Sequence, residues 1–306
     1  MSPVLVAGLT NIETTLRVEG FPIPYVPVHY PFFGVDASVS GVGYNVARAL
    51  TVLGRQVRFL SIIGRDQGAA QVLAQLRADG LSNAFVAQET ERTARSVILY
   101  DTDGRRMIYV DLKNLQERAY PTAMFEAAAR DVVLAVLCNI NFARPMLGAM
   151  QARGVPIATD VHAIADPDDA YNADWMRAAS VLFMSDELLP CAPEEWVRQL
   201  WERYDAPVVV IGRGMQGALL AVRGDGFIGR VPAVYTRPVI NTIGAGDALF
   251  SSFVHVYAAT GDPYLAIRQA MVFASYKIGA TGAADGFLSA AELDRLSATV
   301  YGAPGG

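Results

Sequence analysis

Short runs of consecutive apolar residues alternate along the chain with longer, amphipathic stretches. Each run is closed by a turn or polar residue, and the clearest runs are Val4–Ala7, Val57–Ile63, Val132–Cys138, Pro156–Asp160, Val181–Met184 and Val208–Ile211. Helix-length segments lie between several of them, such as Gln67–Asp79, Arg144–Arg153 and Pro193–Tyr204. Continuous apolar strands separated by helices predict a parallel sheet that is covered on both faces.

Two regions depart from this alternation. Residues 12–40 contain Pro22, Pro24 and Pro27 and show no helical period. Residues 95–110 consist of two strand-like runs around the turn Asp101–Gly104, which predicts a hairpin. We therefore predict a small β subdomain formed by about 12–40 and 95–112. The pattern is compatible both with a lid and with a simple surface decoration.

Composition narrows the class of protein. The chain has 306 residues, of which 52% are hydrophobic, which indicates a folded globular protein with a substantial core. The net charge is −5 and no run of Lys or Arg occurs, which argues against a nucleic-acid partner. A small anionic ligand remains compatible, because backbone amides bind phosphate without net positive charge.

The cysteines and histidines form no metal-ligand pattern. Cys138 and Cys191 are isolated thiols, and His29, His162 and His255 are widely scattered, so we expect structural roles for all of them. The first residues carry no basic flank, and the apolar runs are too short to span a bilayer. These features predict a cytoplasmic protein without a membrane partner.

The stretch Asn241–Asp247 is the most informative segment for chemistry. It follows a predicted strand at Pro238–Ile240 and precedes a helix that ends before Gly261 and has one apolar face: Leu249, Phe250, Phe253, Val254 and Tyr257. Free amides at such a helix start can hold a phosphate. Asp247 could accept a proton from an attacking hydroxyl, or it could simply offset the helix dipole.

The order of these residues, Asn-Thr-Ile-Gly-Ala-Gly-Asp, resembles the Asp-Thr-x-Gly-Ala-Gly-Asp signature of the ribokinase-like (PfkB) carbohydrate kinases. Ser40–Ala47 is similar to the family's second signature, Gly-Gly-x-Gly-x-Asn, with Ser40 in place of the first glycine. Gly8–Glu13 and Gly279–Ala283 resemble the family's first strand and the loop beside the nucleotide. The resemblance implies a single domain over residues 1–306. Its fold would be a three-layer αβα sandwich with a mostly parallel central sheet and a small β lid.

The resemblance also implies a function, the ATP-dependent transfer of a phosphoryl group to a hydroxyl of a small sugar or nucleoside. Asp247 would be the catalytic base, and the amides of Gly244, Ala245 and Gly246 would form the anion hole. The acceptor would bind at Asn11, Glu13, Gly41, Gly43 and Asn45. The nucleotide would bind at Thr242, Ser185, Arg213, Gly214, Gly217, Thr281 and Gly282, with Mg²⁺ bridging its phosphates.

Departures from the family pattern leave some assignments open. Asn241 replaces an aspartate close to where many members hold a monovalent cation, so dependence on K⁺ is left open. Glu13 replaces an aspartate and reaches further toward the acceptor. The family's Asn-x-x-Glu, which is associated with magnesium, is here Ser185–Leu188. Asp186 or Glu187 could take the place of the missing ligand, with Glu187 as the metal candidate, or both could instead cap the next helix.

The role of Arg213 also has two readings. It could reach a phosphate of the nucleotide, or it could be a solvated turn residue.

The acceptor is the least determined part. The residues that stand in the two signature segments are more similar to those of the family's nucleoside kinases, pseudouridine kinases in particular. Tyr25, Phe32, Phe33 and Tyr44 could stack on a base, or they could pack in the core or lid.

Other classes of function also remain. A non-catalytic binding member would fit the altered Asn-x-x-Glu region. A dehydrogenase is disfavoured, because the third glycine of its phosphate-binding turn is missing. An exposed β lid would suit a homodimer.

Overall fold

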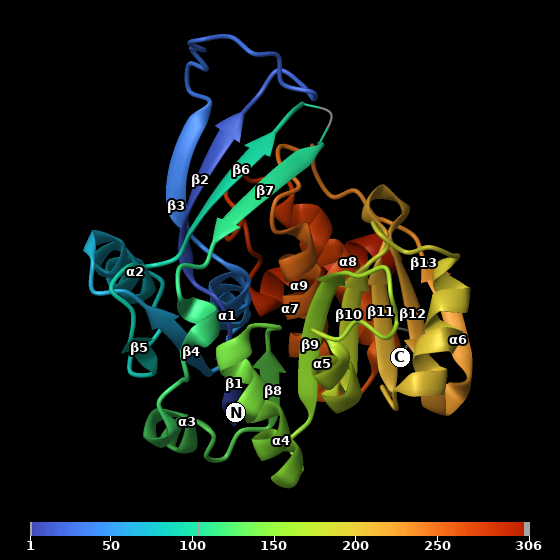
Figure 1. The fold of residues 1–306 in the computed structure, drawn as a ribbon. Coiled ribbons are helices and arrows are strands. Elements are labelled where there is room, and N and C mark those ends of the chain that lie inside the picture. Colours follow the sequence, from blue (N-terminus) through green and yellow to red (C-terminus); the bar gives the residue numbers. More distant parts are fainter. Residues whose placement is uncertain (1, 103, 303–306) are drawn as a thin grey trace.

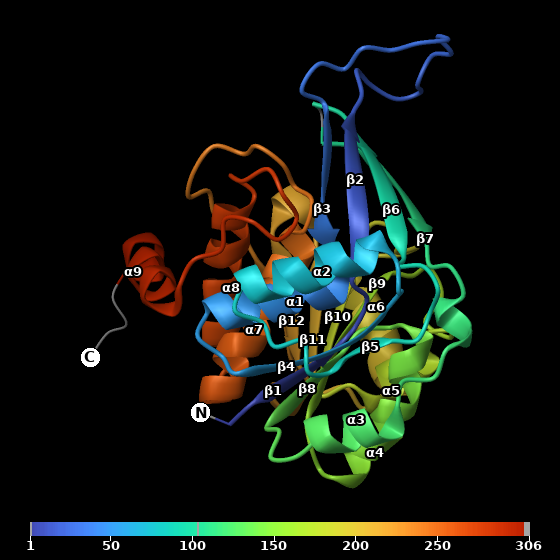
Figure 2. The same cartoon turned by 90° about the vertical axis from the view of Figure 1, so that its left-hand side faces the viewer.

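The computed structural model describes residues 2–102 and 104–302 (Figures 1 and 2). In this part of the chain the main body is a nine-stranded sheet with the order β13-β12-β11-β10-β9-β8-β1-β4-β5. Its strands are β1 (Val4–Ala7), β4 (Val57–Ile63), β5 (Val86–Gln88), β8 (Leu134–Leu137), β9 (Ile157–Ala163), β10 (Val181–Ser185), β11 (Val208–Gly212), β12 (Ala218–Val222) and β13 (Phe227–Val231). Neighbouring strands are parallel from β11 to β5, whereas β12 and β13 are antiparallel.

Helices cover both faces of this sheet, which gives the predicted three-layer αβα sandwich. One face carries α1 (Val42–Val52), α2 (Gln67–Ala78), α7 (Ala245–Thr260) and α8 (Pro263–Lys277), and α9 (Ala290–Tyr301) packs outside α8. The other face carries α3 (Thr122–Ala128), α4 (Arg144–Ala152), α5 (Ala173–Ala178) and α6 (Pro193–Arg203). In β1, Val4 and Val6 pack on the face covered by α1, α2, α7 and α8, whereas Leu5 and Ala7 pack on the face covered by α3 to α6. This strand therefore has no polar face.

Most predicted elements are confirmed within a few residues, but the strand expected at Pro238–Ile240 is wrong. This segment is a loop in which Val239 and Ile240 are exposed. The amides of Ile240 and Asn241 both donate to the Ile278 carbonyl oxygen, at 2.8 and 3.0 Å. The segment is therefore held by the end of α8 and not by a sheet neighbour.

A second, four-stranded sheet stands off the main body (Figure 1). Its order is β3-β2-β6-β7, and its strands are β2 (Asn11–Arg17), β3 (Val35–Ser40), β6 (Arg95–Tyr100) and β7 (Arg106–Asp111). Both predicted regions contribute strands to it. Asp103, in the predicted hairpin turn, lies outside the described residues.

The two faces of the small sheet have different surroundings. Strand register places Thr15, Ile98 and Ile108 on one face, together with the Glu13–Ser96 pair two residues along. Ile98 packs against Ile243 and Ala283 of the main body, so we call this side the inner face. Val97, Met107 and Tyr109 lie on the opposite, outer face, where all three side chains are exposed.

None of the helices within the described ranges is long and apolar enough to cross a bilayer.

Candidate active site

Two helix N-termini meet where the small sheet joins the main body. Asn45 lies in the first turn of α1, and Asp247 lies in the first turn of α7. The Asn45 side-chain amide donates to Asp247 Oδ2 at 2.7 Å. The two sequence signatures, separated by 202 positions at these residues, are thus brought into direct contact.

Backbone packing at both helix starts requires glycine. Gly244, the residue before α7, adopts a left-handed conformation with φ 76°, and a Cβ atom there would lie 2.3 Å from the Ala283 carbonyl oxygen. A Cβ atom on Gly43 would lie 2.4 Å from the backbone of Gly8. These contacts press α1 against the end of β1 and the start of α7 against the 280–285 loop.

The expected anion hole has two amides without a protein partner. The Ala245 amide donates to the Thr242 carbonyl oxygen at 3.1 Å, which closes a turn. For the amides of Gly244 and Gly246, the described part of the chain provides no acceptor. Both lie at the positive end of the α7 dipole, so they are suited to an anionic oxygen.

The carboxylate of Asp247 is in an electrostatically constrained position. Burial raises its pKa, and the hydrogen bond from Asn45 opposes that effect. The nearby charge of Asp160 raises the pKa further, whereas His162 and Lys277 lower it. A carboxylate with a raised pKa is a better proton acceptor than an ordinary surface aspartate.

A buried polar network leads from Asp247 to the inner face of the small sheet. The Ser40 hydroxyl lies 3.4 Å from Asn45 Oδ1, and its one proton is shared between that oxygen and the Glu13 carboxylate. The Ser96 hydroxyl also hydrogen-bonds the Glu13 carboxylate. Burial nevertheless raises the pKa of Glu13. Asn11 donates to Ser96 Oγ at 3.0 Å, and its Oδ1 is buried with no partner in the described chain.

Gly41 immediately precedes α1 and has φ 106°. Ser40 and Ser96 link three of the predicted acceptor-side residues, Asn11, Glu13 and Asn45. The other two, Gly41 and Gly43, lie at the same helix start as Asn45. Tyr44 does not join them. Its ring is buried, and its hydroxyl donates to Asp79 at 2.6 Å, so it packs in the core. Tyr25, Phe32 and Phe33 are exposed on the loop between β2 and β3.

The nucleotide-side residues lie in two loops. Thr281 and Gly282 pack beside Thr242, because the Asn241 side-chain amide donates to the Thr281 carbonyl oxygen at 3.0 Å. Arg213, Gly214 and Gly217 form the turn between β11 and β12, closed by a 2.8 Å bond from the Arg213 amide to the Gly217 carbonyl oxygen. Ser185 ends β10 beside this turn. The Arg213 guanidinium lies 3.6 Å from Asp186.

The interpretation that Asp186 and Glu187 cap the next helix is wrong. Helix α6 begins at Pro193 after Ala192 and has no side-chain cap. Glu187 is exposed and pairs with Arg106 of β7 at 3.3 Å. Among the described residues, no group of three or more His, Cys, Asp or Glu side chains could hold a metal ion.

Three side chains near Asp247 were missed by the sequence reasoning: Asp160, His162 and Lys277. His162 has φ 60°, a strained conformation for a non-glycine residue at the end of β9, and this feature has no sequence signal. Lys277 is one of only two lysines among 25 Lys and Arg residues, but this count does not show where it lies.

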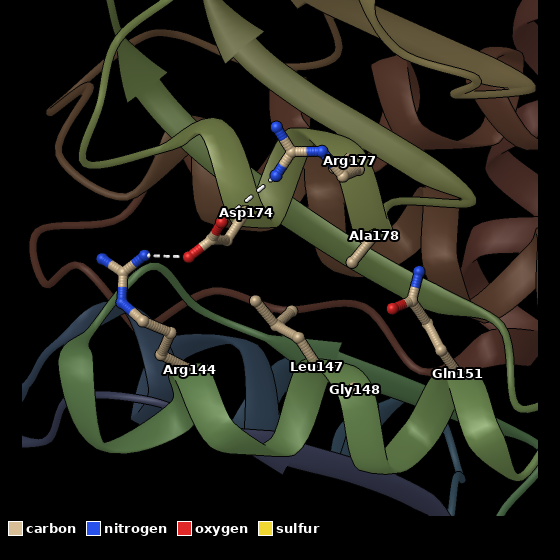
Figure 3. A pocket seen from close by; sticks show the side chains of 7 residues that line it. All are labelled: Arg144, Leu147, Gly148, Gln151, Asp174, Arg177 and Ala178. Atoms are coloured by element: carbon tan, nitrogen blue, oxygen red, sulfur yellow. Dashed lines mark hydrogen bonds and ion pairs between the residues drawn. The ribbon is translucent and has the colours of Figure 1, made fainter.

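A surface cavity of about 250 Å³ between α4 and α5 lies on the other face of the main sheet from α7. Figure 3 shows Asp174 between the guanidinium groups of Arg144 and Arg177, at 2.7 and 3.2 Å. Arg144 also stacks over Trp175 at 4.1 Å. These charges are satisfied within the cavity wall, so the cavity is not the candidate active site.

Comparison with known proteins agrees with this geometry. A family model described as pfkB family carbohydrate kinase matches residues 1–290. An acarbose 7(IV)-phosphotransferase from an Actinoplanes species is 29% identical over 265 residues, which cover 85% of this chain and 86% of the relative.

Two solved structures have the same fold. A microbiome-derived acarbose kinase has a TM-score of 0.87 and 26% identity, covering 97% of this chain and 99% of its own. A Burkholderia thailandensis nucleoside kinase in complex with inosine has a TM-score of 0.80 over 98% of both chains. At 21% identity, this second likeness shows the fold alone.

Proposed function

Because the chain belongs to the pfkB family of carbohydrate kinases, and is therefore an ATP-dependent kinase with an alcohol group as acceptor, we propose that it transfers the γ-phosphoryl group of ATP to a hydroxyl of a small carbohydrate. One observation carries the proposal most directly. The 2.7 Å contact between Asn45 and Asp247 holds a carboxylate of raised pKa at the same helix start as two unpartnered amides.

In the proposed mechanism, Asp247 accepts the proton of the acceptor hydroxyl as its oxygen attacks the γ-phosphorus. A new O–P bond forms, the O–P bond to the β-phosphate breaks, and ADP leaves. The amides of Gly244 and Gly246 stabilise charge on the transferring phosphoryl oxygens, and α7 adds its dipole. Asn45 keeps the carboxylate directed at the acceptor. Ala245 contributes mainly by closing the turn that presents the two amides.

The nucleotide would lie across the loops that carry Thr242, Thr281 and Gly282 and the turn that carries Arg213, Gly214 and Gly217, with Ser185 at the edge. Mg²⁺, when bound, would neutralise charge between the β- and γ-phosphates. The small sheet would act as a lid that excludes water and limits ATP hydrolysis.

A carbohydrate acceptor suits the polar network on the inner face. Asn11, Glu13 and Asn45 offer both donors and acceptors to sugar hydroxyls, and Asn11 Oδ1 is free. The likeness to two proteins named for phosphorylating acarbose supports the same class of acceptor.

A nucleoside is the second candidate acceptor. The exposed rings of Tyr25, Phe32 and Phe33 belong to the loop of the lid, from which they could stack on a base when the lid closes.

An ATP-consumption screen tests the proposal. Pentoses, hexoses, ketogluconate, acarbose and nucleosides including pseudouridine would each be incubated with ATP and Mg²⁺. We expect acceptor-dependent ADP formation by the protein, and a much slower rate from an Asp247→Asn control purified in the same way, which excludes a contaminating kinase. Turnover on nucleosides alone would favour the second candidate. ATP binding without turnover on any acceptor would favour a non-catalytic member.

A further inference from the structure

A lysine side chain is completely buried directly behind the anion hole. Lys277 is the last residue of α8, and its ammonium group donates to the Ile243 carbonyl oxygen. Burial of a lysine is costly unless its charge is compensated, and lysine is almost never fully buried without a partner. The carboxylates of Asp247, Asp285 and Glu13 all stabilise this ammonium. The chain therefore maintains a positive charge inside the protein, one residue from Gly244.

The contact with Ile243 fixes the direction of a catalytic amide. The Ile243 carbonyl and the Gly244 amide belong to the same planar peptide unit, in which C=O and N–H point in opposite directions. Holding the carbonyl oxygen on Lys277 therefore directs the Gly244 N–H away from the protein interior. The close approach of Gly244 to Ala283 restricts the alternative orientations of this peptide.

The oxygens around this loop are already engaged by protein donors. Asn241 Oδ1 accepts the Ile243 amide at 2.8 Å. The Thr281 carbonyl oxygen accepts from Asn241, and the Ile278 carbonyl oxygen accepts two amides. Asn241 also brings no negative charge. These residues do not fit a monovalent metal cation, which needs several free oxygens and would lie beside an ammonium group.

We propose that the Lys277 ammonium is a built-in cation that positions the Gly244 amide for phosphoryl transfer and makes the enzyme independent of added potassium. The proposal rests on the kinase function proposed above. Lys277 is in this view a positioning residue, because it acts through the Ile243–Gly244 peptide.

The first test compares the wild-type rate in potassium chloride with the rate in tetramethylammonium chloride at equal ionic strength. We expect equal rates. Saturable activation by K⁺ would overturn the proposal, whereas no turnover in either salt would mean that the proposed function itself is wrong.

The second test removes the charge. Lys277→Met keeps most of the side-chain volume, and we expect kcat to fall by about 10²-fold, the cost of losing one anion-hole donor, with little change in the KM of the acceptor. Lys277→Ala leaves a cavity, in which ethylammonium should restore part of kcat and the neutral propanol should not. Wild-type kcat in Lys277→Met would contradict the proposal.

Ser275→Ala is the matched control. Ser275 is also buried on α8, and its Oγ accepts the Thr236 amide at 2.9 Å, so this variant loosens the same helix without touching Ile243. We expect it to lower the thermal midpoint and to keep kcat. An equal loss of kcat in Ser275→Ala would assign the effect to packing alone and overturn the proposal.

A spectroscopic measurement gives a readout that is independent of turnover. The chain has two lysines, so a spectrum of ¹⁵N-labelled lysine side chains contains two ammonium environments, assigned with Lys277→Met. The Lys277 signal should shift when a non-hydrolysable ATP analogue binds, and it should not change when K⁺ is added. A Lys277 signal that responds to K⁺ and ignores the analogue would contradict the built-in cation even if the enzyme is active.

Discussion

At the residue scale, the site depends on how a few charged groups tolerate burial. Asp247 and Glu13 both have raised pKa values because of burial, and Lys277 has a pKa lowered to about 8 for the same reason. The positive charge of Lys277 stabilises the negative charges of Asp247 and Glu13, and these carboxylates stabilise the ammonium group in turn. The network therefore combines a catalytic requirement with an electrostatic cost to folding.

Replacement of Asp247 by Asn should separate these two effects. Loss of the base is expected to lower kcat by about 10²–10⁴-fold. The thermal midpoint should change little, because removal of a carboxylate that is costly to bury also removes a charge that stabilises the Lys277 ammonium. Steady-state kinetics and thermal unfolding check the two parts, and a large change in the thermal midpoint would contradict the electrostatic account.

The pH dependence of the reaction should have two limbs. As the pH falls through the raised pKa of Asp247, the base is protonated and kcat/KM declines at a higher pH than for an ordinary aspartate. As the pH rises above about 8, Lys277 loses its proton and the Gly244 amide loses its support. Glu13, Asp285, Asp247 and Arg106 are the charged groups that face Lys277.

Linkage gives the sign of the stability change. The unfolded chain binds the Lys277 proton more tightly, so the contribution of this group to the free energy of unfolding rises between about pH 8 and its ordinary pKa of 10.5. A pH–rate profile of Lys277→Met should lack the alkaline limb. Persistence of that limb would assign it to another group.

At the element scale, the start of α7 contains two glycines that differ in the space available for a side chain. Gly244 has a positive φ and contacts the Ala283 backbone, whereas a Cβ atom on Gly246 would meet no atom within 4 Å. The first glycine is needed for the structure of the loop. The second is open toward the region in which we place the phosphoryl group.

Alanine at each glycine should therefore give different results. Gly244→Ala is expected to lose activity and to lower the free energy of unfolding by about 1–3 kcal/mol, because of strain and overlap. Gly246→Ala should keep wild-type stability and lose activity, because the methyl group occupies the phosphoryl position. Chemical denaturation and kcat measured on both variants decide this, and an active Gly246→Ala enzyme would move the phosphoryl group elsewhere.

Elements with strong local signals could be predicted from sequence. The end of α7 was recognisable from Gly261, which adopts a left-handed conformation with φ 69°, and from the Asp262 cap of α8. Pro238–Ile240 was misassigned because its apolar residues suggested a strand, although no neighbouring strand is available to it. Sequence patterns do not reveal such missing partners.

The contacts between distant elements were predictable only through the family resemblance. Asn45 and Asp247 were linked by their signatures. Asp160, His162 and Lys277 carry no such pattern, and a lysine at a helix end is usually explained by the helix dipole. Their placement near Asp247 depends on tertiary packing.

At the scale of the whole molecule, the lid has two faces with different expected roles. The exposed outer-face residues Val97, Met107 and Tyr109 form an apolar area at an edge strand, which is a suitable surface for a second copy of the chain. Ile108 is the neighbour of Met107 and Tyr109 but lies on the inner face.

A pair of adjacent substitutions tests this division. We expect the wild type to sediment as a dimer and Tyr109→Asp to sediment as a monomer. Ile108→Asp should remain dimeric and raise the KM of the acceptor. Analytical ultracentrifugation and kinetics provide the measurements, and a monomeric wild type would remove the lid-mediated dimer.

The interior position of β1, between β8 and β4, has a consequence for the order in which the protein can fold. This strand is made first, but its neighbours β4 and β8 begin 53 and 130 residues after its own start at Val4, by their register with Val57 and Leu134. The Asn45–Asp247 contact must wait longer still, for α7. Closing such large loops is entropically slow. A ribosome-bound chain can therefore bury the face of the sheet that α3 to α6 cover while it still lacks Asp247. Any activity that depends on this carboxylate is then among the last properties that the nascent protein acquires.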